Sequence, residues 1–308
     1  MRVAIIGQQA FGKAVLEAFI ARGHHVAAVF LDAEQRPSPK PGPLKLAADE
    51  RGLPVHVFAN YGAPEALAVL ERLGVDLGVM AYVTQFVPQS FYRLPRFGMI
   101  QFHPSLLPRY RGPSAMNWAI IEGERQTGLT IFRPIDGLDE GPILMQREVA
   151  VGPDDTVGAV YFDRIFPLGV TAMVETAEAI IAGRARETAQ DESLATYQGW
   201  VREAESRIDW AKPVDQTYDL IRGCNPAPGA WTLWNGRRLQ IFDARRSSAR
   251  SFGAVRGLKH GQVTAATAQS FTIFAQGGFI EVLRCRVADG KKIPAGEAGL
   301  TPGIVLGG

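Results

Sequence analysis

The first hundred residues alternate short β-branched apolar runs with segments whose apolar residues recur at helical spacing. Residues 3–7 form an apolar run closed by glycine, residues 14–20 carry the helical pattern, and residues 25–31 form a second apolar run. Strand, helix and strand in this order predict a right-handed crossover between parallel strands. Because the alternation continues to residue 102, we predict an α/β fold with a Rossmann-like open, mostly parallel sheet and helices on both faces.

From residue 208 onward the pattern changes to short strands separated by glycines, which is typical of a small β-barrel. At 308 residues the chain exceeds the length at which a single hydrophobic core usually stops growing. We therefore expect a first domain over residues 1–190, a linker over 191–206 and a smaller, OB-like C-terminal β-barrel domain over 207–308. Within the first domain, a helical stretch over residues 156–181 is expected to be kinked or divided at Pro167.

The composition is that of an ordinary soluble globular chain, with 46% apolar and 21% charged residues. The N-terminus lacks a signal-peptide pattern and no later segment approaches the length needed to span a bilayer, so we expect a cytoplasmic location and no membrane partner. Cys224 and Cys285 fit neither a disulfide framework nor a metal-binding spacing. We therefore expect no metal site.

Charge is unevenly distributed along the chain. Acids outnumber bases before residue 205, and bases outnumber acids after it. Within residues 237–260, seven Lys and Arg residues are opposed only by Asp243. This stretch is compatible with a solvated face and with a surface that faces a polyanion such as tRNA.

The turn over residues 7–12 tests a nicotinamide-binding alternative. Asp32 follows the second predicted strand, where a dinucleotide fold places the acid that binds the ribose. The fingerprint needs a glycine two residues after Gly7 so that the backbone can approach the pyrophosphate, and the chain has Gln9 there. The nicotinamide alternative is therefore disfavoured, and we expect no NAD(P).

His103 stands where a strand-like run becomes a rigid loop. Pro104 and Pro108 hold the following segment extended, because proline fixes φ and restricts its predecessor. Ligands bind beyond the carboxyl ends of strands in open α/β sheets. The acidic turn over residues 136–141 supplies Asp139, which could orient His103 or act as a base. The structural alternative is a histidine satisfied by a backbone carbonyl and an aspartate that caps a turn.

Other reaction classes lack their motifs. The chain contains no Gly-x-Ser-x-Gly elbow, no His-Glu-x-x-His pair and no P-loop. The aromatic loop over residues 82–88 could sandwich a flat heterocycle, although core packing explains most aromatic side chains. An acid/base pair beside such a pocket suits acyl transfer, in which a developing oxyanion needs a positioned donor.

Three segments resemble the folate-dependent formyltransferase family. Residues 103–112 read HPSLLPRYRG and residues 136–141 read DGLDEG, which is similar to the family signature, and residues 221–231 resemble its C-terminal-domain motif. The family includes methionyl-tRNA formyltransferase and the N-terminal hydrolase domain of 10-formyltetrahydrofolate dehydrogenase. The resemblance implies that residues 1–190 form a catalytic domain that binds 10-formyltetrahydrofolate as co-substrate.

The resemblance also implies site residues. His103 and Asp139 match the family's catalytic His and Asp, and the third polar position, usually Asn, falls on Gln101. Attack of water or an amine on the formyl carbon would be assisted by Asp139, while His103 and Gln101 would stabilise the oxyanion. The implied folate-binding residues are Met80, Tyr82, Phe86, Val87, Pro88, Phe102, Ser105, Leu106, Ile135, Asp136, Gly137 and Leu138.

The acceptor of the formyl group is expected to be water, as in the hydrolase domain. Residues 6–12 and 102–105 resemble that domain, and residues 32–51 carry acids and bases in equal number, which offers phosphates no net attraction. The basic stretch 237–260 favours the alternative acceptor, methionyl-tRNA. A small amine, such as an amino sugar or hydroxylamine, is a third case. A catalytically silent folate- or RNA-binding protein is the alternative from another class.

Overall fold

The computed structural model describes residues 1–33 and 40–307. The chain forms two compact units. The first comprises residues 1–112, 128–149 and 163–197, and the second comprises residues 113–127, 150–162 and the chain from residue 198 onward. The expected domains were continuous in sequence, whereas two short internal segments belong with the C-terminal unit.

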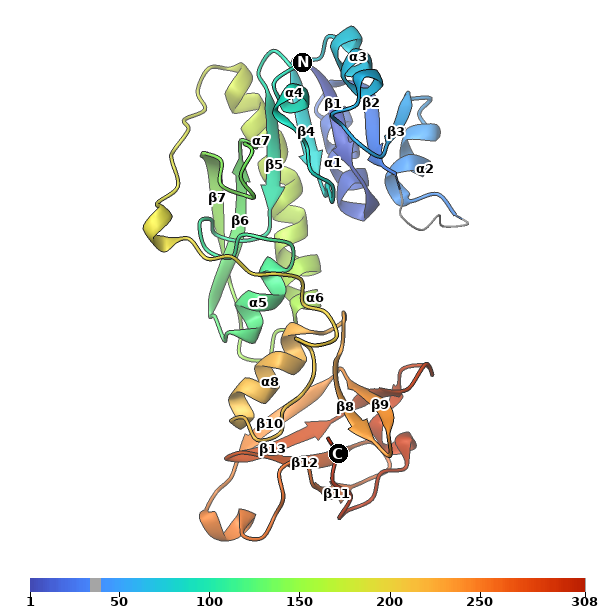
Figure 1. Ribbon diagram of the computed structural model, residues 1–308, viewed down its shortest axis with the longest axis vertical. Coiled ribbons are helices and arrows are strands. Elements are labelled where there is room, and N and C mark those ends of the chain that lie inside the picture. The colour runs from blue at the N-terminus through green and yellow to red at the C-terminus, as the bar shows by residue number, and fades with distance from the viewer. Residues whose placement is uncertain (34–39, 308) are drawn as a thin grey trace. The chain divides into compact units, whose positions relative to one another are not determined.

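The first unit is built on a seven-stranded sheet with the order β3-β2-β1-β4-β5-β6-β7 (Figure 1). Its first five strands pair in parallel, and β6 pairs antiparallel to β5. This confirms the predicted Rossmann-like, mostly parallel sheet. The strands are β1 (Arg2–Gly7), β2 (His25–Asp32), β3 (Val55–Phe58), β4 (Leu77–Ala81), β5 (Met99–His103), β6 (Gln126–Phe132) and β7 (Ile143–Ala150).

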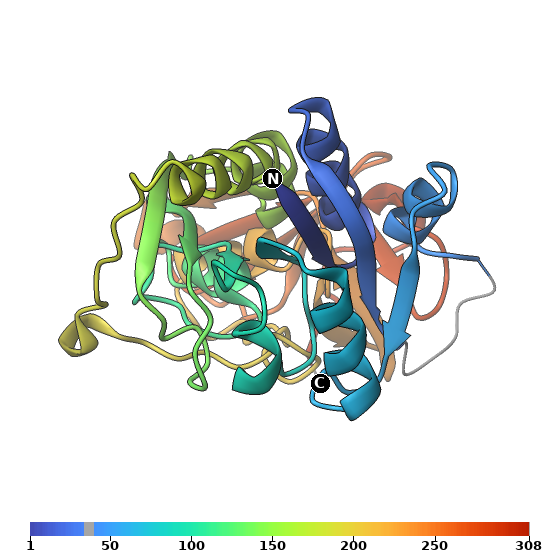
Figure 2. The ribbon, with the colours of Figure 1, turned by 90° about the horizontal axis from the view of Figure 1, so that it is seen from above.

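Helices cover both faces of this sheet, as predicted (Figure 2). On one face, the ring of Phe11 in α1 lies 4.3 Å from that of Phe102 in β5. On the other, Leu70 and Phe91 share a core with Met80 of β4. The helices of this unit are α1 (Gln9–Ala21), α2 (Pro43–Asp49), α3 (Pro64–Leu73), α4 (Gln89–Tyr92) and α7 (Phe166–Ile181).

The expected long helix is divided near Pro167. A short α6 (Val157–Val160) continues through a π-helical turn (Tyr161–Ile165) into α7, whose first turn contains Pro167. The helical run Val157–Ile181 is long and apolar enough to cross a membrane, so the expectation that no segment approaches that length was wrong. The π-helical turn separates α6 from α7, but the three segments follow one another without a gap and form one helical run. Core helices pass the same test of length and composition, so the run is a weak indication.

The second unit contains two four-stranded antiparallel sheets, with the orders β10-β13-β12-β11 and β15-β14-β9-β8. One hydrophobic core includes residues from both sheets and from α8, among them Ile221, Ile273 and Cys285. The elements are α5 (Ala115–Ile121), α8 (Val214–Gly223), β8 (Ala230–Trp234), β9 (Arg237–Ile241), β10 (Ala244–Ser248), β11 (Val263–Ala266), β12 (Phe271–Ala275), β13 (Gly278–Val282), β14 (Arg284–Val287) and β15 (Ile293–Pro294), with 3₁₀ turns at Phe252–Val255 and Ala295–Ala298.

The expected inert cysteines lie inside this second unit. Cys224 and Cys285 are both buried and free. Burial disfavours the thiolate, so the pKa of Cys224 is raised to about 12 and that of Cys285 to about 11. Both side chains therefore act as core residues.

Candidate active site

The structure brings together the histidine and the aspartate that the sequence singled out. Nδ1 of His103, at the end of β5, lies 3.5 Å from Oδ2 of Asp139. Nε2 of His103 lies 2.8 Å from the carbonyl oxygen of Tyr110. The Gly112 amide donates to Oδ2 of Asp139 over 2.9 Å. Both side chains are buried, so little bulk water surrounds the pair.

The loop after β5 is held by its own hydrogen bonds. The Ser105 hydroxyl donates to the Arg109 carbonyl over 2.8 Å, and the Thr130 hydroxyl donates to the Ser105 carbonyl over 2.7 Å. Leu106 packs so closely on Gly128 that a Cβ there would lie 2.5 Å from the leucine side chain. Ser105 and Leu106, both predicted to bind substrate, thus form part of the support for the His103 loop.

The predicted pocket corresponds to a cavity of about 130 Å³ beyond the ends of β4 and β5. Several of its apolar walls are open to solvent, with Phe86 66% and Leu138 59% exposed. Exposed apolar side chains around a hollow are typical of a ligand-binding site. The predicted residues that line the cavity are Met80, Phe86, Val87, Gln101, Ile135, Asp136, Gly137, Leu138 and Asp139.

The other predicted site residues lie elsewhere. Phe102 points to the opposite face of the sheet, where it packs on Phe11. His103, Tyr82 and Pro88 are also outside the cavity lining, although Tyr82 and Pro88 belong to the loop that supplies Phe86 and Val87. Lining residues that the sequence did not single out are Gln85, Phe132 and Pro134.

The glycines of the acidic turn make room for neighbouring parts of the chain. A Cβ on Gly137 would lie 1.8 Å from Oε2 of Glu140, and a Cβ on Gly141 would lie 1.6 Å from the Arg133 carbonyl oxygen. Asp139 itself adopts a left-handed backbone conformation with φ of 56°. The turn is therefore closely packed, and its shape sets the direction of the Asp139 side chain.

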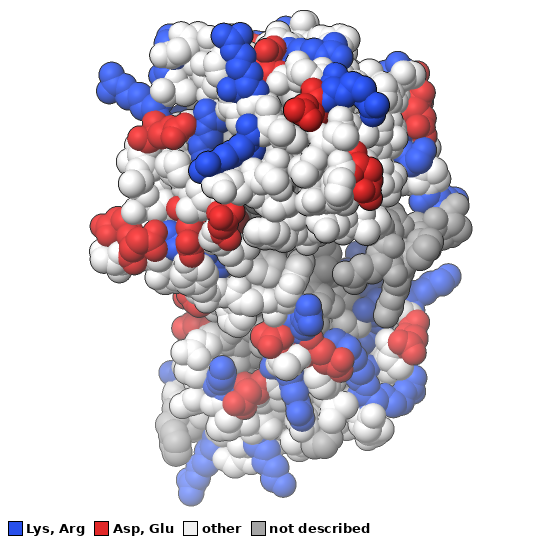
Figure 3. All heavy atoms as spheres, turned by 45° about the horizontal axis from the view of Figure 1, so that its top comes forward, with Lys and Arg blue, Asp and Glu red and all other residues white. Residues whose placement is uncertain are grey.

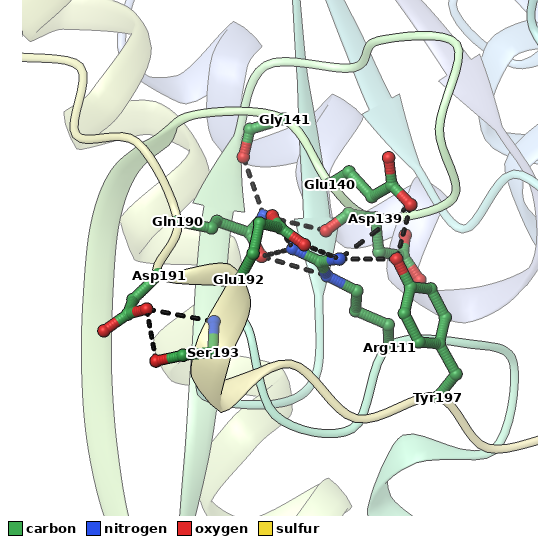
Figure 4. A network of polar contacts seen from close by, with 9 residues as sticks. All are labelled: Arg111, Asp139, Glu140, Gly141, Gln190, Asp191, Glu192, Ser193 and Tyr197. Carbon is green, nitrogen blue, oxygen red and sulfur yellow. Dashed lines mark hydrogen bonds and ion pairs between the residues drawn. The ribbon is translucent and has the colours of Figure 1, made fainter.

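A network of hydrogen bonds around the buried side chain of Arg111 supports the acidic turn over residues 136–141 (Figure 4). The Arg111 side chain is fully buried and donates to Oε1 of Gln190 and to both carboxylate oxygens of Glu192, at distances of 2.7 to 3.1 Å. Nε2 of Gln190 donates to the carbonyls of Asp139 and Gly141 over 2.8 and 2.7 Å. The sequence predicted a linker beginning at residue 191, whereas Gln190 and Glu192 are tied to the site.

The carboxylate of Asp32 accepts hydrogen bonds from other groups of this chain. Its Oδ1 accepts hydrogen bonds from the Tyr61 hydroxyl and Gln85, and its Oδ2 accepts from the amide and hydroxyl of Thr84, all within 3.1 Å. Because a carboxylate offers about four lone-pair sites, these hydrogen bonds use its capacity to accept. Burial, followed by the charge of Asp32, raises the pKa of Tyr61 far above its usual value. These contacts further disfavour Asp32 as a ribose-binding acid.

Two family models match the sequence. The description "Formyl transferase" covers residues 1–177, and "Formyl transferase, C-terminal domain" covers residues 201–299. The chain belongs to the formyl transferase family. The resemblance seen in the sequence is thereby confirmed.

Relatives of this formyl transferase include proteins of different overall length. The chain is 36% identical to mitochondrial 10-formyltetrahydrofolate dehydrogenase from Mus musculus over 307 residues, which are 96% of this chain and 33% of that protein. It is 33% identical to methionyl-tRNA formyltransferase from Geobacter metallireducens, over 100% of this chain and 99% of the relative. The chain thus spans about a third of the length of the curated dehydrogenases that it matches.

Solved structures show the same fold. HypX from Aquifex aeolicus, in complex with tetrahydrofolic acid, superposes with a TM-score of 0.70 at 19% identity, covering 97% of this chain and 46% of that chain. At this identity the likeness concerns the fold alone. It agrees with the Rossmann-like sheet and the antiparallel C-terminal strands described above.

The basic stretch of this formyl transferase is partly neutralised by acids from outside it. Arg246 contacts Asp215, and Arg238 lies 3.4 Å from Glu203. The sequence alone showed only Asp243 opposing these cations. On the whole face shown in Figure 3, acidic and basic side chains are interspersed. Within residues 1–33 and 40–307, no group of three or more His, Cys, Asp or Glu could hold a metal ion.

Proposed function

We propose that this formyl transferase binds 10-formyltetrahydrofolate in the cavity beside Asp139 and transfers its formyl group to water. Formate and tetrahydrofolate are the products. The observation that carries the proposal is the buried His103–Asp139 pair, 3.5 Å apart, beside a cavity that Gln101 and Asp139 both line. The exposed apolar rim formed by Phe86 and Leu138 suits the flat pterin ring.

The hydrogen bonds of His103 define its part in the reaction. The Tyr110 carbonyl only accepts, so Nε2 carries a proton, and Nδ1 is the nitrogen that faces Asp139. Nδ1 can donate to an oxyanion only when the ring is the imidazolium. His103 then stabilises the negative oxygen that develops on the formyl group.

Asp139 is placed to accept the proton of the attacking water and to pass it on to N10. Water attacks the formyl carbon, its proton passes to the Asp139 carboxylate, and the bond between that carbon and N10 breaks as N10 receives the proton. The Gly112 amide holds Oδ2 of the carboxylate over 2.9 Å. This hydrogen bond keeps the base in one orientation while the substrate changes charge.

Gln101 supplies the third polar group. It is paired in register with Met80 of β4 and Phe132 of β6, so the sheet fixes its backbone at the cavity. Its amide can donate to the developing oxyanion as the more usual Asn would. The additional methylene in Gln101 extends the reach of the amide into the cavity.

Several observations support water as the acceptor. Identity to the 10-formyltetrahydrofolate dehydrogenases is 36% in the example above, against 33% for the methionyl-tRNA formyltransferase. Residues 32–51 have no net charge. The pairing of Arg246 with Asp215 and of Arg238 with Glu203 reduces the charge available to a polyanion.

Methionyl-tRNA is the second candidate acceptor. The match to a methionyl-tRNA formyltransferase covers nearly the whole of both chains, and residues from 205 onward carry excess positive charge. A small amine such as an amino sugar or hydroxylamine is the third candidate. Each would use the same donor and the same His103–Asp139 pair.

The deciding experiment measures release of tetrahydrofolate from 10-formyltetrahydrofolate. Parallel reactions contain the folate alone, the folate with charged initiator tRNA, and the folate with hydroxylamine. Rapid release with the folate alone supports hydrolysis, whereas release only with tRNA or hydroxylamine overturns water as the acceptor. Folate binding with no release in any reaction, measured by fluorescence titration, would instead identify a silent binding protein. The His103→Ala variant gives the uncatalysed rate.

A further inference from the structure

Gln190 occupies a position that the proposed reaction does not yet use. Both protons of its side-chain amide are donated to one turn, to the carbonyls of Asp139 and Gly141. Its Oε1 accepts from two nitrogens of Arg111, over 3.1 and 2.7 Å. Carbonyls only accept and a guanidinium only donates, so only one orientation of the amide satisfies all four contacts.

The turn that Gln190 contacts needs such support. Asp139 has a φ of 56°, a left-handed conformation that is uncommon for residues other than glycine. Its carbonyl is one of the two that accept from Gln190. The same backbone conformation sets the carboxylate 3.5 Å from Nδ1 of His103. A change in this peptide would therefore move the carboxylate away from His103.

Arg111 connects this support to the other half of the site. It follows Tyr110, whose carbonyl accepts from His103, and it precedes Gly112, whose amide donates to Asp139. The Arg111 amide donates to the Thr196 carbonyl over 2.9 Å. Figure 4 shows the guanidinium between Gln190 and Glu192 on one side and Tyr197 on the other. The segment from Gln190 to Tyr197 therefore braces both loops of the site.

We propose that Gln190, held by Arg111, is a positioning residue that fixes Asp139 against His103. This inference rests on the proposed function of the His103–Asp139 pair. Gln190 touches the Asp139 backbone and leaves the carboxylate free to react. Its effect is therefore on the rate of the chemical step, and the folate cavity, which it does not line, keeps its affinity.

The test compares two variants of the full chain. Gln190→Glu keeps an acceptor for Arg111 but loses both donors to the turn, and Gln190→Met has a similar shape but makes neither set of hydrogen bonds. We expect kcat for hydrolysis of 10-formyltetrahydrofolate to fall on the order of 10- to 100-fold in both variants, with KM within about threefold of wild type. The control is Glu297→Gln, a change at an exposed residue of the second unit, for which kcat and KM should stay at their wild-type values.

Two results would overturn the proposal. One is kcat within about twofold of wild type in both Gln190 variants, and the other is a rise in KM with kcat unchanged. A second readout is hydrogen exchange of the Gly112 amide, which reports the Asp139 carboxylate. If the wild-type protein releases no tetrahydrofolate with the folate alone, with charged initiator tRNA or with hydroxylamine, the proposed function fails. Faster exchange in the Gln190 variants alone would then still support positioning, and unchanged exchange would contradict it.

Discussion

Nε2 of His103 lies 2.8 Å from the carbonyl oxygen of Tyr110, so the protein backbone fixes which ring nitrogen carries a proton. The other nitrogen faces Asp139. In solution either ring nitrogen of a histidine can carry the proton, whereas here Nε2 carries it and Nδ1 faces Asp139. In the proposed reaction, His103 therefore stabilises the developing charge and Asp139 transfers the proton.

We expect His103→Ala and Asp139→Asn each to lower kcat by about 10²- to 10⁴-fold, the range for loss of a positioned acid, base or oxyanion donor. The cavity walls stay intact, so the dissociation constant for 10-formyltetrahydrofolate should change by less than about threefold. Steady-state kinetics and equilibrium titration measure the two quantities. Wild-type turnover in both variants would show that the pair is not the reaction centre.

The length of the Gln101 side chain gives a prediction about how far its amide extends into the cavity. Gln101→Leu removes the amide from the cavity, and we expect kcat to fall by about 10²- to 10³-fold, as for other oxyanion donors. Gln101→Asn keeps the amide but withdraws it by one methylene, so its kcat should lie between those of wild type and Gln101→Leu. If Gln101→Leu turns over as fast as wild type, Gln101 contributes only to the shape of the cavity.

Asp32 gives a prediction about the cavity loop. Asp32→Asn replaces one carboxylate oxygen with an NH₂ group, which faces either the Thr84 amide or the Tyr61 hydroxyl, and we expect a loss of about 1–3 kcal/mol in the free energy of unfolding. Gln85 lines the cavity and loses its carboxylate acceptor, keeping only the Phe58 carbonyl, so the folate dissociation constant should rise several-fold. Urea unfolding and fluorescence titration measure both.

Tyr61→Phe is the matched control for Asp32, because it removes one donor to the carboxylate and leaves the contacts to Thr84 and Gln85. Its unfolding free energy should fall by about 1 kcal/mol, with folate affinity unchanged. Equal loss of folate affinity in both variants would indicate a general loosening of the unit.

His24 gives a prediction about pH. Burial, with a smaller contribution from the N-terminal charge, lowers the pKa of His24 below its ordinary value, although Glu178 at 3.4 Å opposes the shift. The unfolded chain therefore binds the proton more tightly, and stability falls as pH falls through the window from the unfolded pKa, about 6.5, to the lower folded value. His24→Gln should flatten this dependence between about pH 7.5 and pH 5, measured by urea midpoints. Parallel wild-type and variant curves would exclude the effect.

Much of the fold followed from local patterns. The β-α-β opening and the glycine-separated C-terminal strands predicted both sheet types because strand and helix periodicities are properties of short segments. The division into units did not follow, because α5 and α6 lie in sequence among the elements of the first unit. Which core a helix joins depends on contacts far away in sequence, such as the bond from Asn117 to the Gly223 carbonyl.

The site was predictable in part for the same reason. His103, Asp139 and Gln101 lie at a strand end or a turn, where the pattern is informative. Side chains alternate between the two faces along a strand, so Gln101 and Phe102 point to opposite faces of the sheet. The prediction that Gln101 lies in the cavity was therefore incompatible with a place for Phe102 in the same cavity. Gln190 carried no such signal, since its role depends on hydrogen bonds to the backbone of a distant turn.

The interleaving of the two units limits how this protein can be recombined with its relatives. A single crossover near residue 197 would join one parent's sheet to the other parent's C-terminal strands, yet α5 would still come from the first parent. The Asn117 side chain donates to the Gly223 carbonyl over 2.8 Å, so each hybrid would place unmatched sequences against each other inside one core. Exchange of the C-terminal unit therefore requires residues 113–127 and 150–162 to move with it.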